Sequence, residues 1–506
     1  MAREGKAPEP TVTRVEILPP AISGQAVTVR WTVDPPSPLY RRTEFTLRFP
    51  DGVDLRRVPE RVWWIVVLAC LYPHWALLRP CRVELPVVLG PGEAETWLRL
   101  TDAAVATLES LRGTTRLDRE IEIVERGVPL APVRLPDEGD RCATAFSGGK
   151  DSLVQVGLLA ELTARPLLVT TTSPLPETHD HVTPRRRHVL AEITRRRDVA
   201  HVEVESDFRE CWVNRFAHDI GYPIGVNELT DTLLYFGTTL AAGVALGARH
   251  FFLASEVEVN QNAEWAGQIV QHSHFVYSTV TQRTLQALLR PVGVRYCSLT
   301  SPLHSYQVQE LLWTRYRDLR DLQYSCWQVG PAESACNRCR QCLRLALCAL
   351  ALGDSPRRMG VNLTRLLWSQ RGWRLTHLDG GATHNLLPGR QVAAALERQT
   401  ARFIQGTSLG RVAREVAADG RAGLADPRAW LALLAFARLR QRSRVVDAPP
   451  GFRAGFLAQI DPLLRERVAT IFREHYRPQP ESEYARVLER NNALVRRITE
   501  PLGGEG

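Results

Sequence analysis

Lysine is almost absent from this chain of 506 residues. All but two of the 64 basic residues are arginine, and the two lysines are Lys6 and Lys150. So strong a bias indicates base-composition pressure rather than a need for arginine chemistry. An ammonium is a compact point charge that fits a tight phosphate pocket, whereas a guanidinium is a wide planar fork. Lys150, the one lysine outside the terminal segment, is therefore a candidate for a specific role.

Long apolar runs are also lacking. The longest, residues 63–72, is half of the ~20 residues that a membrane-spanning helix needs. The first ten residues contain no apolar core, so we expect no secretory signal. Hydrophobic residues make up 44% of the chain and charged residues 24%, which excludes the disordered and fibrous classes. We expect a globular, cytoplasmic protein without a membrane partner, whose net charge of +9 permits an anionic one.

The apolar pattern divides the chain into three stretches. Residues 1–140 predict an N-terminal α+β domain, which would pack against the next domain or shape the interface of a homo-oligomer. After a linker at 135–140, short apolar runs alternate with helical periodicity up to residue 353, which predicts an α/β domain with a parallel sheet. Residues 354–506 predict a helical C-terminal domain. The predicted strands of the central domain are residues 142–146, 166–171, 200–205 and 250–254, and its helices lie near 151–163, 184–197 and 228–246.

The most informative motif is a glycine-rich turn between the first central strand and the helix after it. It reads Ser147-Gly148-Gly149-Lys150-Asp151-Ser152. The glycines let a phosphate approach the backbone, and the free N–H groups of the helix start favour an anion. We expect Lys150 to neutralise a phosphate oxygen, and Asp151 to cap the helix or hold Mg²⁺. The two serine hydroxyls can donate hydrogen bonds; a turn without chemical function is the alternative.

Four of the ten cysteines are grouped in the sequence. A C-x₂-C-x₂-C knuckle follows ten residues after a further cysteine, and the four are Cys326, Cys336, Cys339 and Cys342. Four thiolates at this spacing can surround a tetrahedral Zn²⁺ and leave no open position, which predicts a structural site. An iron–sulfur cluster and a set of thiols without metal are the alternatives. Cys348 continues into an apolar helix and is expected in the core.

The loop matches SGGxDS, the signature of the PP-loop ATP pyrophosphatase family, and the central domain resembles that family. The resemblance implies a doubly wound, HUP-like core. It also implies that ATP and Mg²⁺ bind at the six loop residues, that a substrate oxygen attacks the α-phosphorus, and that pyrophosphate leaves an adenylate behind. Ligands of such sheets lie across the carboxyl ends of the strands. Thr170 and Thr171, at the end of the second strand, are therefore candidates for contacting the nucleoside.

Two branches of this family are similar to about 200 central residues. The loop together with Ser325-Cys326 and the knuckle resembles 7-cyano-7-deazaguanine synthases, which adenylate a carboxylate, add ammonia and carry a four-cysteine zinc site. Residues 226–345 look like the MurL glutamate epimerases, at Asn227, at Ser255-Glu256 and at 298–303. Those enzymes use ATP to activate a peptide carboxylate before its α-carbon is inverted. The chain is thus expected to be an AMP-forming ligase of a small-molecule or peptide carboxylate, with an ATP-dependent epimerase as the alternative.

An acyl adenylate serves either outcome. We expect Glu256, at a strand end, to act with Lys150 and Asp151 in catalysis, and Asn227 to contact the nucleotide. Helix capping is the alternative for Glu256 and Asn227, and for the nearby Asp231. Inversion also needs an acid/base pair. The candidates for that pair are Glu256, Glu258, His272 and His274.

Two further classes stay open from the sequence. PP-loop enzymes that modify transfer RNA also carry SGGKDS and cysteine knuckles, and the arginine triplets 185–187 and 195–197 could follow phosphates. Both triplets fall on one predicted helix, where a solvated basic face is the alternative and the one we favour. A nucleotide sensor with a degenerate loop is the other class, which the intact lysine and serines argue against.

Overall fold

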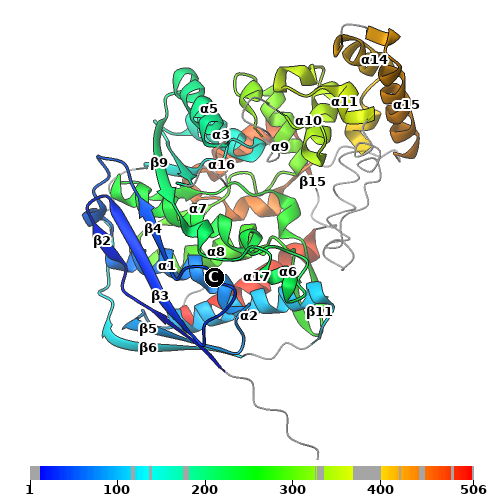
Figure 1. Ribbon diagram of the computed structural model, residues 1–506. Coiled ribbons are helices and arrows are strands. Elements are labelled where there is room, and N and C mark those ends of the chain that lie inside the picture. The colour runs from blue at the N-terminus through cyan, green and yellow to red at the C-terminus, as the bar shows by residue number, and fades with distance from the viewer. Residues whose placement is uncertain are drawn as a thin grey trace, which may run out of the picture.

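The computed structural model describes residues 12–503 apart from 116–119, 136–139, 175–181, 325, 327–334, 369–400, 421–422, 444–450 and 480–483. Its centre is a sheet of eleven strands in the order β13-β10-β7-β8-β9-β4-β3-β1-β5-β6, with β2 paired to β3. Helices cover both faces of this sheet (Figure 1). The chain is therefore an α/β protein, as the sequence predicts.

One half of the sheet is entirely parallel. Its strands are β7 (Cys142–Ala145), β8 (Leu167–Thr172), β9 (Ala200–Ser206), β10 (His250–Phe252) and β13 (Arg295–Cys297). The first four confirm predicted strands, and β13 is one that the sequence pattern did not reveal. The connecting helices are α3 (Lys150–Leu162), α5 (Val182–Arg196), α7 (Val226–Ala245) and α8 (Thr279–Leu289). Across the sheet the strands run third, second, first, fourth, fifth in chain order, which is the order of doubly wound sheets.

The strand sequences divide their side chains between two cores. Every residue of β7 and β8 is buried. Ala143 and Val169 belong to the core beneath α7 and α8, whereas Cys142 and Leu168 belong to the core beneath α3 and α5. Successive side chains of a strand point to opposite faces. Strands covered on both faces therefore read as continuous apolar runs.

The N-terminal block extends the same sheet. Its elements are β1 (Thr13–Ile17), β2 (Ala21–Ser23), β3 (Ala26–Asp34), β4 (Glu44–Arg48), α1 (Glu60–Trp75), β5 (Cys81–Val88), α2 (Glu93–Arg112) and β6 (Ile121–Pro129). Strand β4 pairs antiparallel with β9, at Leu47 opposite Ser206 and Arg48 opposite Glu205. Helix α1 is buried from Arg61 to its end and packs on α7. The block is thus joined to the edge of the sheet by strand pairing.

The remaining elements lie after β10, and some of them pack against the helices that cover the sheet. Those between β10 and the C-terminal stretch are η3 (Val257–Asn260), β11 (Asn262–Trp265), β12 (Gln268–Gln271), α9 (Ser305–Thr314) and α10 (Arg340–Ala351). The C-terminal stretch contains α11 (Leu363–Trp368), α14 (Leu409–Ala418), α15 (Pro427–Arg442), β14 (Phe452–Arg453), α16 (Pro462–His475), β15 (Pro478–Gln479) and α17 (Ala485–Thr499). Helix α16 packs in the core beneath α3, and α17 packs on α2 and α8 on the opposite face. Helices α11, α14 and α15 pack on one another.

The three-domain division stays a prediction. Most of the expected linker, at 136–139, lies outside the described residues, as does Ser325. Within the described ranges, no helix combines the length and the apolar character that crossing a bilayer requires.

Candidate functional site

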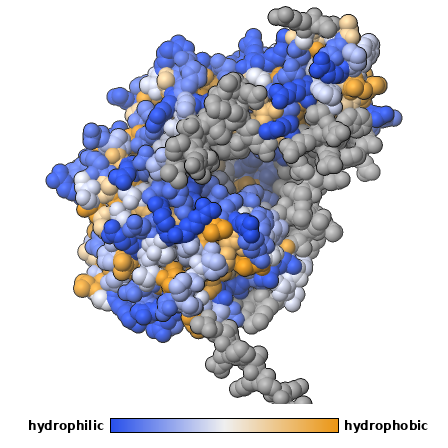
Figure 2. All heavy atoms as spheres, viewed as in Figure 1, coloured by the Kyte–Doolittle hydropathy of each residue, from blue (hydrophilic) through white to orange (hydrophobic). Residues whose placement is uncertain are grey.

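The glycine-rich loop lies where the sheet changes its winding direction. Strand β7 has β8 on one side and β10 on the other. Helix α3, which leads to β8, packs in one core, whereas α7, which leads from β9 to β10, packs in the core on the opposite face. Doubly wound sheets bind ligands at this point, outside the carboxyl ends of the strands. The loop follows β7, and Glu256 follows β10. In the view of Figure 2 the surface is hollowed between the part of the molecule that carries α8 and the part that carries α10.

The loop folds as the glycines require. Gly148 has a φ of +80°, a left-handed conformation that favours glycine, and Gly149 is the N-cap of α3. The hydroxyl of Ser152 donates to the carbonyl oxygen of Gly149 at 2.9 Å, and lies 3.4 Å from the Ser147 hydroxyl. The N–H of Tyr324 donates to the carbonyl oxygen of Gly148 at 2.8 Å. The turn is thus stabilised by contacts of its own serines and by a hydrogen bond from Tyr324.

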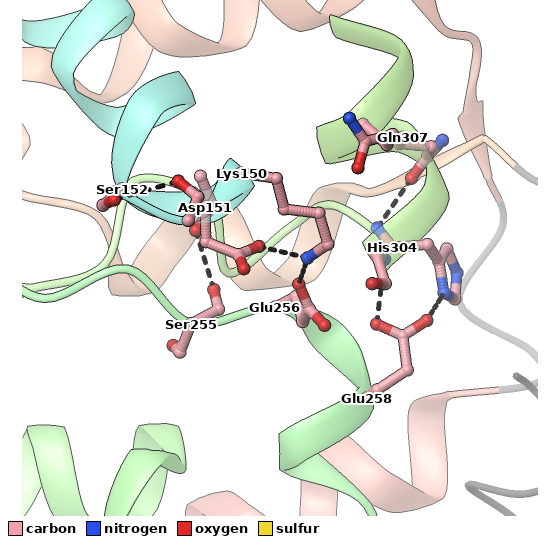
Figure 3. Close-up of polar contacts among 12 residues, drawn as sticks. Lys150, Asp151, Ser152, Ser255, Glu256, Glu258, His304 and Gln307 are labelled. Atoms are coloured by element: carbon pink, nitrogen blue, oxygen red, sulfur yellow. Dashed lines mark hydrogen bonds and ion pairs between the residues drawn. The ribbon is translucent and has the colours of Figure 1, made fainter. Parts of the chain in front are cut away.

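Lys150 connects the loop after β7 with the segment after β10. Its Nζ donates to Asp151 Oδ1 and to Glu256 Oε2, both at 2.6 Å (Figure 3). The Lys150 and Glu256 side chains are each 18% exposed, and that of Asp151 is 33% exposed. The structure thus brings together the three residues predicted as catalytic, although 106 positions separate Lys150 from Glu256.

The three groups shift one another's ionisation. Burial alone would lower the pKa of Lys150, but the two carboxylates outweigh it and raise that pKa. Burial and the charge of Glu256 raise the pKa of Asp151 well above its ordinary value. Burial would also raise the pKa of Glu256, but the Lys150 ammonium overcomes it and lowers that pKa. The surroundings thus favour the ionised forms of Lys150 and Glu256 and the protonated form of Asp151.

A second ionisable group lies beside this cluster. Buried Glu258 accepts from Nδ1 of buried His304 at 2.8 Å and from the N–H of Ser305 at 3.1 Å (Figure 3). Nε2 of His304 accepts from Nε of Arg453 at 3.3 Å. Because a carboxylate only accepts, the proton of a neutral His304 sits on Nδ1. Sequence reasoning named Glu258 but missed His304 and Arg453, since no short-range pattern links them.

The hydroxyls of the two threonines at the end of β8 contact other groups of the protein. The Thr170 hydroxyl lies 3.3 Å from the Phe146 carbonyl oxygen, and that of Thr171 lies 2.7 Å from the Thr238 hydroxyl. Their contact with a nucleoside stays a prediction. Two basic groups lie beside them. Buried Arg186 donates to the Thr171 carbonyl oxygen at 3.0 Å, and the Arg185 guanidinium lies 5.0 Å from the centre of the Tyr324 ring.

Asn227 and Asp231 are engaged at the start of α7. The side-chain oxygen of Asn227 accepts from Trp212 Nε1 at 2.7 Å, and Asp231 pairs with Arg209 through two contacts of 2.9 Å. Eleven residues of helix, ~16 Å along its axis, separate Asn227 from Thr238, the α7 residue that touches the end of β8. Asn227 thus holds the preceding segment onto the helix, and its contact with the nucleotide stays a prediction.

The two histidine candidates also lie at that end of α7. The rings of His272 and His274 are 5.2 Å apart, and Nδ1 of His274 is 3.9 Å from Glu228. Of the four acid/base candidates, the structure thus places Glu256 and Glu258 near the loop, and the histidines beside the first turn of α7.

The four cysteines form a compact cluster at the start of α10. Their sulfurs all lie within 4.8 Å of one another. Three of the separations are 3.8 Å (Cys326–Cys339), 3.8 Å (Cys336–Cys342) and 3.5 Å (Cys339–Cys342). A tetrahedral zinc ion with bonds of ~2.3 Å holds its sulfurs ~3.8 Å apart. The cluster could therefore bind a metal such as zinc, and Cys348 is buried further along the same helix.

Most arginines of the two triplets pair with acidic residues. Arg187 pairs with Glu203, Arg195 with Glu192, Arg196 with Asp321 and Arg197 with Asp318. Because Arg185 lies over the Tyr324 ring and buried Arg186 donates to the Thr171 carbonyl oxygen, the triplets do not present one continuous basic face.

Comparisons of the chain with protein-family models, with curated proteins and with solved structures find no match. A function can therefore be argued only from the site itself.

Proposed function

We propose that the protein is an ATP-dependent enzyme of the PP-loop type, which converts a substrate carboxylate to an acyl adenylate and releases pyrophosphate. The observation that carries this proposal is the contact of Lys150 with Glu256 across the point where the sheet changes direction. It joins a phosphate-binding turn to a carboxylate that follows a neighbouring strand. A turn without chemical function gives no reason for the one lysine outside the terminal segment to lie there.

The residues present suit the α-phosphorus chemistry of ATP. The triphosphate would lie against the amides at the start of α3, which favour negative charge. Lys150 would neutralise the oxygen that becomes part of pyrophosphate. Asp151 and Glu256 would hold Mg²⁺, which supplies further charge for the departing phosphates and favours the ionised form of Asp151. The substrate carboxylate then attacks the α-phosphorus, and the α–β bridging oxygen leaves with its electron pair.

The second step decides between ligase and epimerase. We place an amide- or nitrile-forming ligase first. Attack by ammonia on the adenylate requires little more than a dry pocket, and it releases AMP. The epimerase alternative requires a positioned base to remove a proton from the α-carbon. Glu258 and His304 would be the candidates for it, and His304 would have to release Arg453 from its Nε2 to act. The pairing of the arginine triplets with acids gives less support to a transfer-RNA substrate.

The cysteine cluster would hold Zn²⁺ in a structural role. Four thiolates leave a tetrahedral ion no open position for substrate. The short sulfur separations favour one ion over an iron–sulfur cluster, in which different irons hold the sulfurs.

A nucleotide assay tests the proposal directly. The purified chain is incubated with Mg²⁺, ATP and a panel of free amino acids, N-acylated amino acids, dicarboxylates and transfer RNA. We expect at least one carboxylate to stimulate the release of AMP and pyrophosphate in equal amounts. Release of ADP and phosphate instead would contradict the mechanism, and stimulation by transfer RNA alone would favour the nucleic-acid alternative.

A further inference from the structure

Tyr324 links the phosphate loop to the cysteine cluster. Its N–H donates to the Gly148 carbonyl oxygen at 2.8 Å, and its side chain is buried, with 4% exposed. The next described residue along the chain, Cys326, belongs to the cluster. Two residues span at most ~7 Å of chain. A displacement of Cys326 by a few ångströms would therefore also shift the nearby Tyr324 N–H, which donates to the loop.

The hydrogen bond sets the direction of a phosphate-binding amide. The Gly148 carbonyl and the Gly149 N–H belong to one planar trans peptide unit, so they point in opposite directions. While Tyr324 holds the carbonyl outward, the Gly149 N–H is aimed at the inner side of the turn, 3.5 Å from the Ser147 hydroxyl. Gly148 has a φ of +80° and no side chain that would resist rotation of this unit. The Tyr324 N–H is therefore the contact from outside the loop that orients this peptide unit, in addition to the contact with Ser147 inside it.

A metal ion would fix that donor. Cys339 caps α10 and Cys342 lies in its first turn, with Cys336 just before the helix, whereas Cys326 comes from the segment that carries Tyr324. A bound ion thus ties this segment to α10. On the other side, Gln323 exchanges two side-chain hydrogen bonds with Gln309 of α9, at 2.6 and 3.1 Å. The Tyr324 N–H is then held from both directions.

We propose that the four-cysteine site positions the phosphate loop through Tyr324, so that metal and nucleotide bind with positive coupling. The proposal rests on the proposed binding of ATP at the loop. By thermodynamic linkage, the factor by which the metal raises the affinity for nucleotide equals the factor by which nucleotide raises the affinity for metal. Couplings of this kind amount to roughly 5- to 150-fold.

The test measures both directions on the full-length chain. Calorimetric titration with Mg²⁺ and α,β-methylene-ATP, which cannot be cleaved at the reacting bond, compares zinc-loaded protein with zinc-stripped protein. We expect binding to weaken at least ~5-fold without zinc. In the reverse direction, zinc release to a coloured chelator should slow in the presence of the analogue. Equal nucleotide affinity with and without zinc would overturn the proposal.

Two cysteine variants provide the matched comparison. Cys326→Ser removes one ligand of the cluster and should bring nucleotide affinity to the level of the zinc-stripped protein. Cys348→Ser makes the same chemical change at a buried thiol outside the cluster and should leave that affinity unchanged. If Cys326→Ser fails to fold, the wild-type measurement of zinc release still decides. Zinc-loaded protein that binds no nucleotide would contradict the proposed function, whereas binding that ignores zinc would contradict only the coupling.

Discussion

The positive charge at the centre of the site is the ammonium of Lys150. Lys150 touches both Asp151 and Glu256 at 2.6 Å, in a chain that otherwise uses arginine as its cation. A guanidinium is too wide to make both contacts from the same position without displacing the carboxylates. We therefore expect that arginine cannot take over the role of Lys150.

We expect Lys150→Ala to reduce carboxylate-dependent pyrophosphate release by ~10²–10³-fold or more, because the developing charge loses its preorganised cation. Lys150→Arg should restore little of the rate, because its fork does not fit the same space. The measurement is the rate of pyrophosphate release at saturating ATP. Lys6→Arg is the matched control and should behave as the wild type. A Lys150→Arg variant with full activity would show that any cation suffices.

Asp151 should make the stability of the nucleotide-free protein depend on pH. Its pKa in the folded state lies well above 3.8, so the folded state binds this proton more tightly than the unfolded state. The free energy of unfolding therefore falls as the pH rises from 3.8 through the folded pKa. Asp151→Asn lacks this ionisation, and both proteins retain the facing charges of Lys150 and Glu256. We expect the variant to melt at a higher temperature than the wild type at pH 7.

The check is a series of thermal melts between pH 4 and pH 8 without divalent ions. The difference in melting temperature should shrink toward pH 4, where the wild-type carboxyl is protonated. The same variant should lose pyrophosphate release, because it loses a ligand for Mg²⁺. A difference in melting temperature that is constant across the pH range would contradict the assigned ionisation.

At the scale of elements, the two glycines of the turn between β7 and α3 differ in the backbone conformation that the turn requires of them. Gly148 has a φ of +80°, whereas Gly149 has a φ of −76°, which any residue adopts. A side chain at Gly148 would meet nothing closer than the Tyr324 Cβ at 3.8 Å. The demand at Gly148 is therefore conformational and not steric.

We expect Gly148→Ala to strain the turn by about 1–2 kcal/mol, and to weaken binding of α,β-methylene-ATP by about tenfold as the amides lose their alignment. Gly149→Ala should have a smaller effect on the fold, because its Cβ would meet only the Ser147 hydroxyl, at 3.6 Å. Melting temperature and calorimetric affinity provide the comparison. Equal destabilisation by the two changes would refute the conformational argument.

The sequence predicts those elements that lie in one short, continuous segment of the chain. The loop, the cysteine knuckle and the strands β7 to β10 were visible because each is written in a short, continuous segment. Strand β13 has only three residues, Arg295–Cys297, too few for a pattern. His304 and Tyr324 escaped notice because their roles depend on contacts with Glu258 and Gly148, which lie 46 and 176 positions away. The side-chain oxygen of Asn227 accepts from Trp212, which the sequence did not reveal, and its contact with the nucleotide stays a prediction.

At the scale of the whole molecule, the N-terminal strands extend the central sheet, and helices of the C-terminal stretch pack against the helices that cover it. The segment after β10 that carries Glu256 and Glu258 is fixed by α17, near the end of the chain. Buried Asn491 of α17 donates to the Asn260 carbonyl oxygen at 3.1 Å and accepts from the Asn262 side chain at 2.8 Å. The helical character of this region follows from its composition, but its packing depends on contacts more than 200 residues apart, which no local pattern encodes.

We expect Asn491→Ala to destabilise the protein by about 1–3 kcal/mol, because it removes a buried partner of the Asn262 amide, and to reduce pyrophosphate release along with stability. Arg490→Ala, one residue earlier, breaks an exposed ion pair with Glu264 and should cost no more than ~1 kcal/mol. Urea denaturation measures both. Equal stability of the two variants would show that α17 does not support the site.

The most direct test of the central claim follows an oxygen atom. The carboxylate that supports AMP release is labelled with ¹⁸O in its carboxyl group, and the products are examined by mass spectrometry. If the carboxylate attacks the α-phosphorus and the acyl group is then transferred or released at its carbon, one labelled oxygen leaves with AMP and none enters pyrophosphate. Label in inorganic phosphate together with ADP, or unlabelled AMP, would contradict the account.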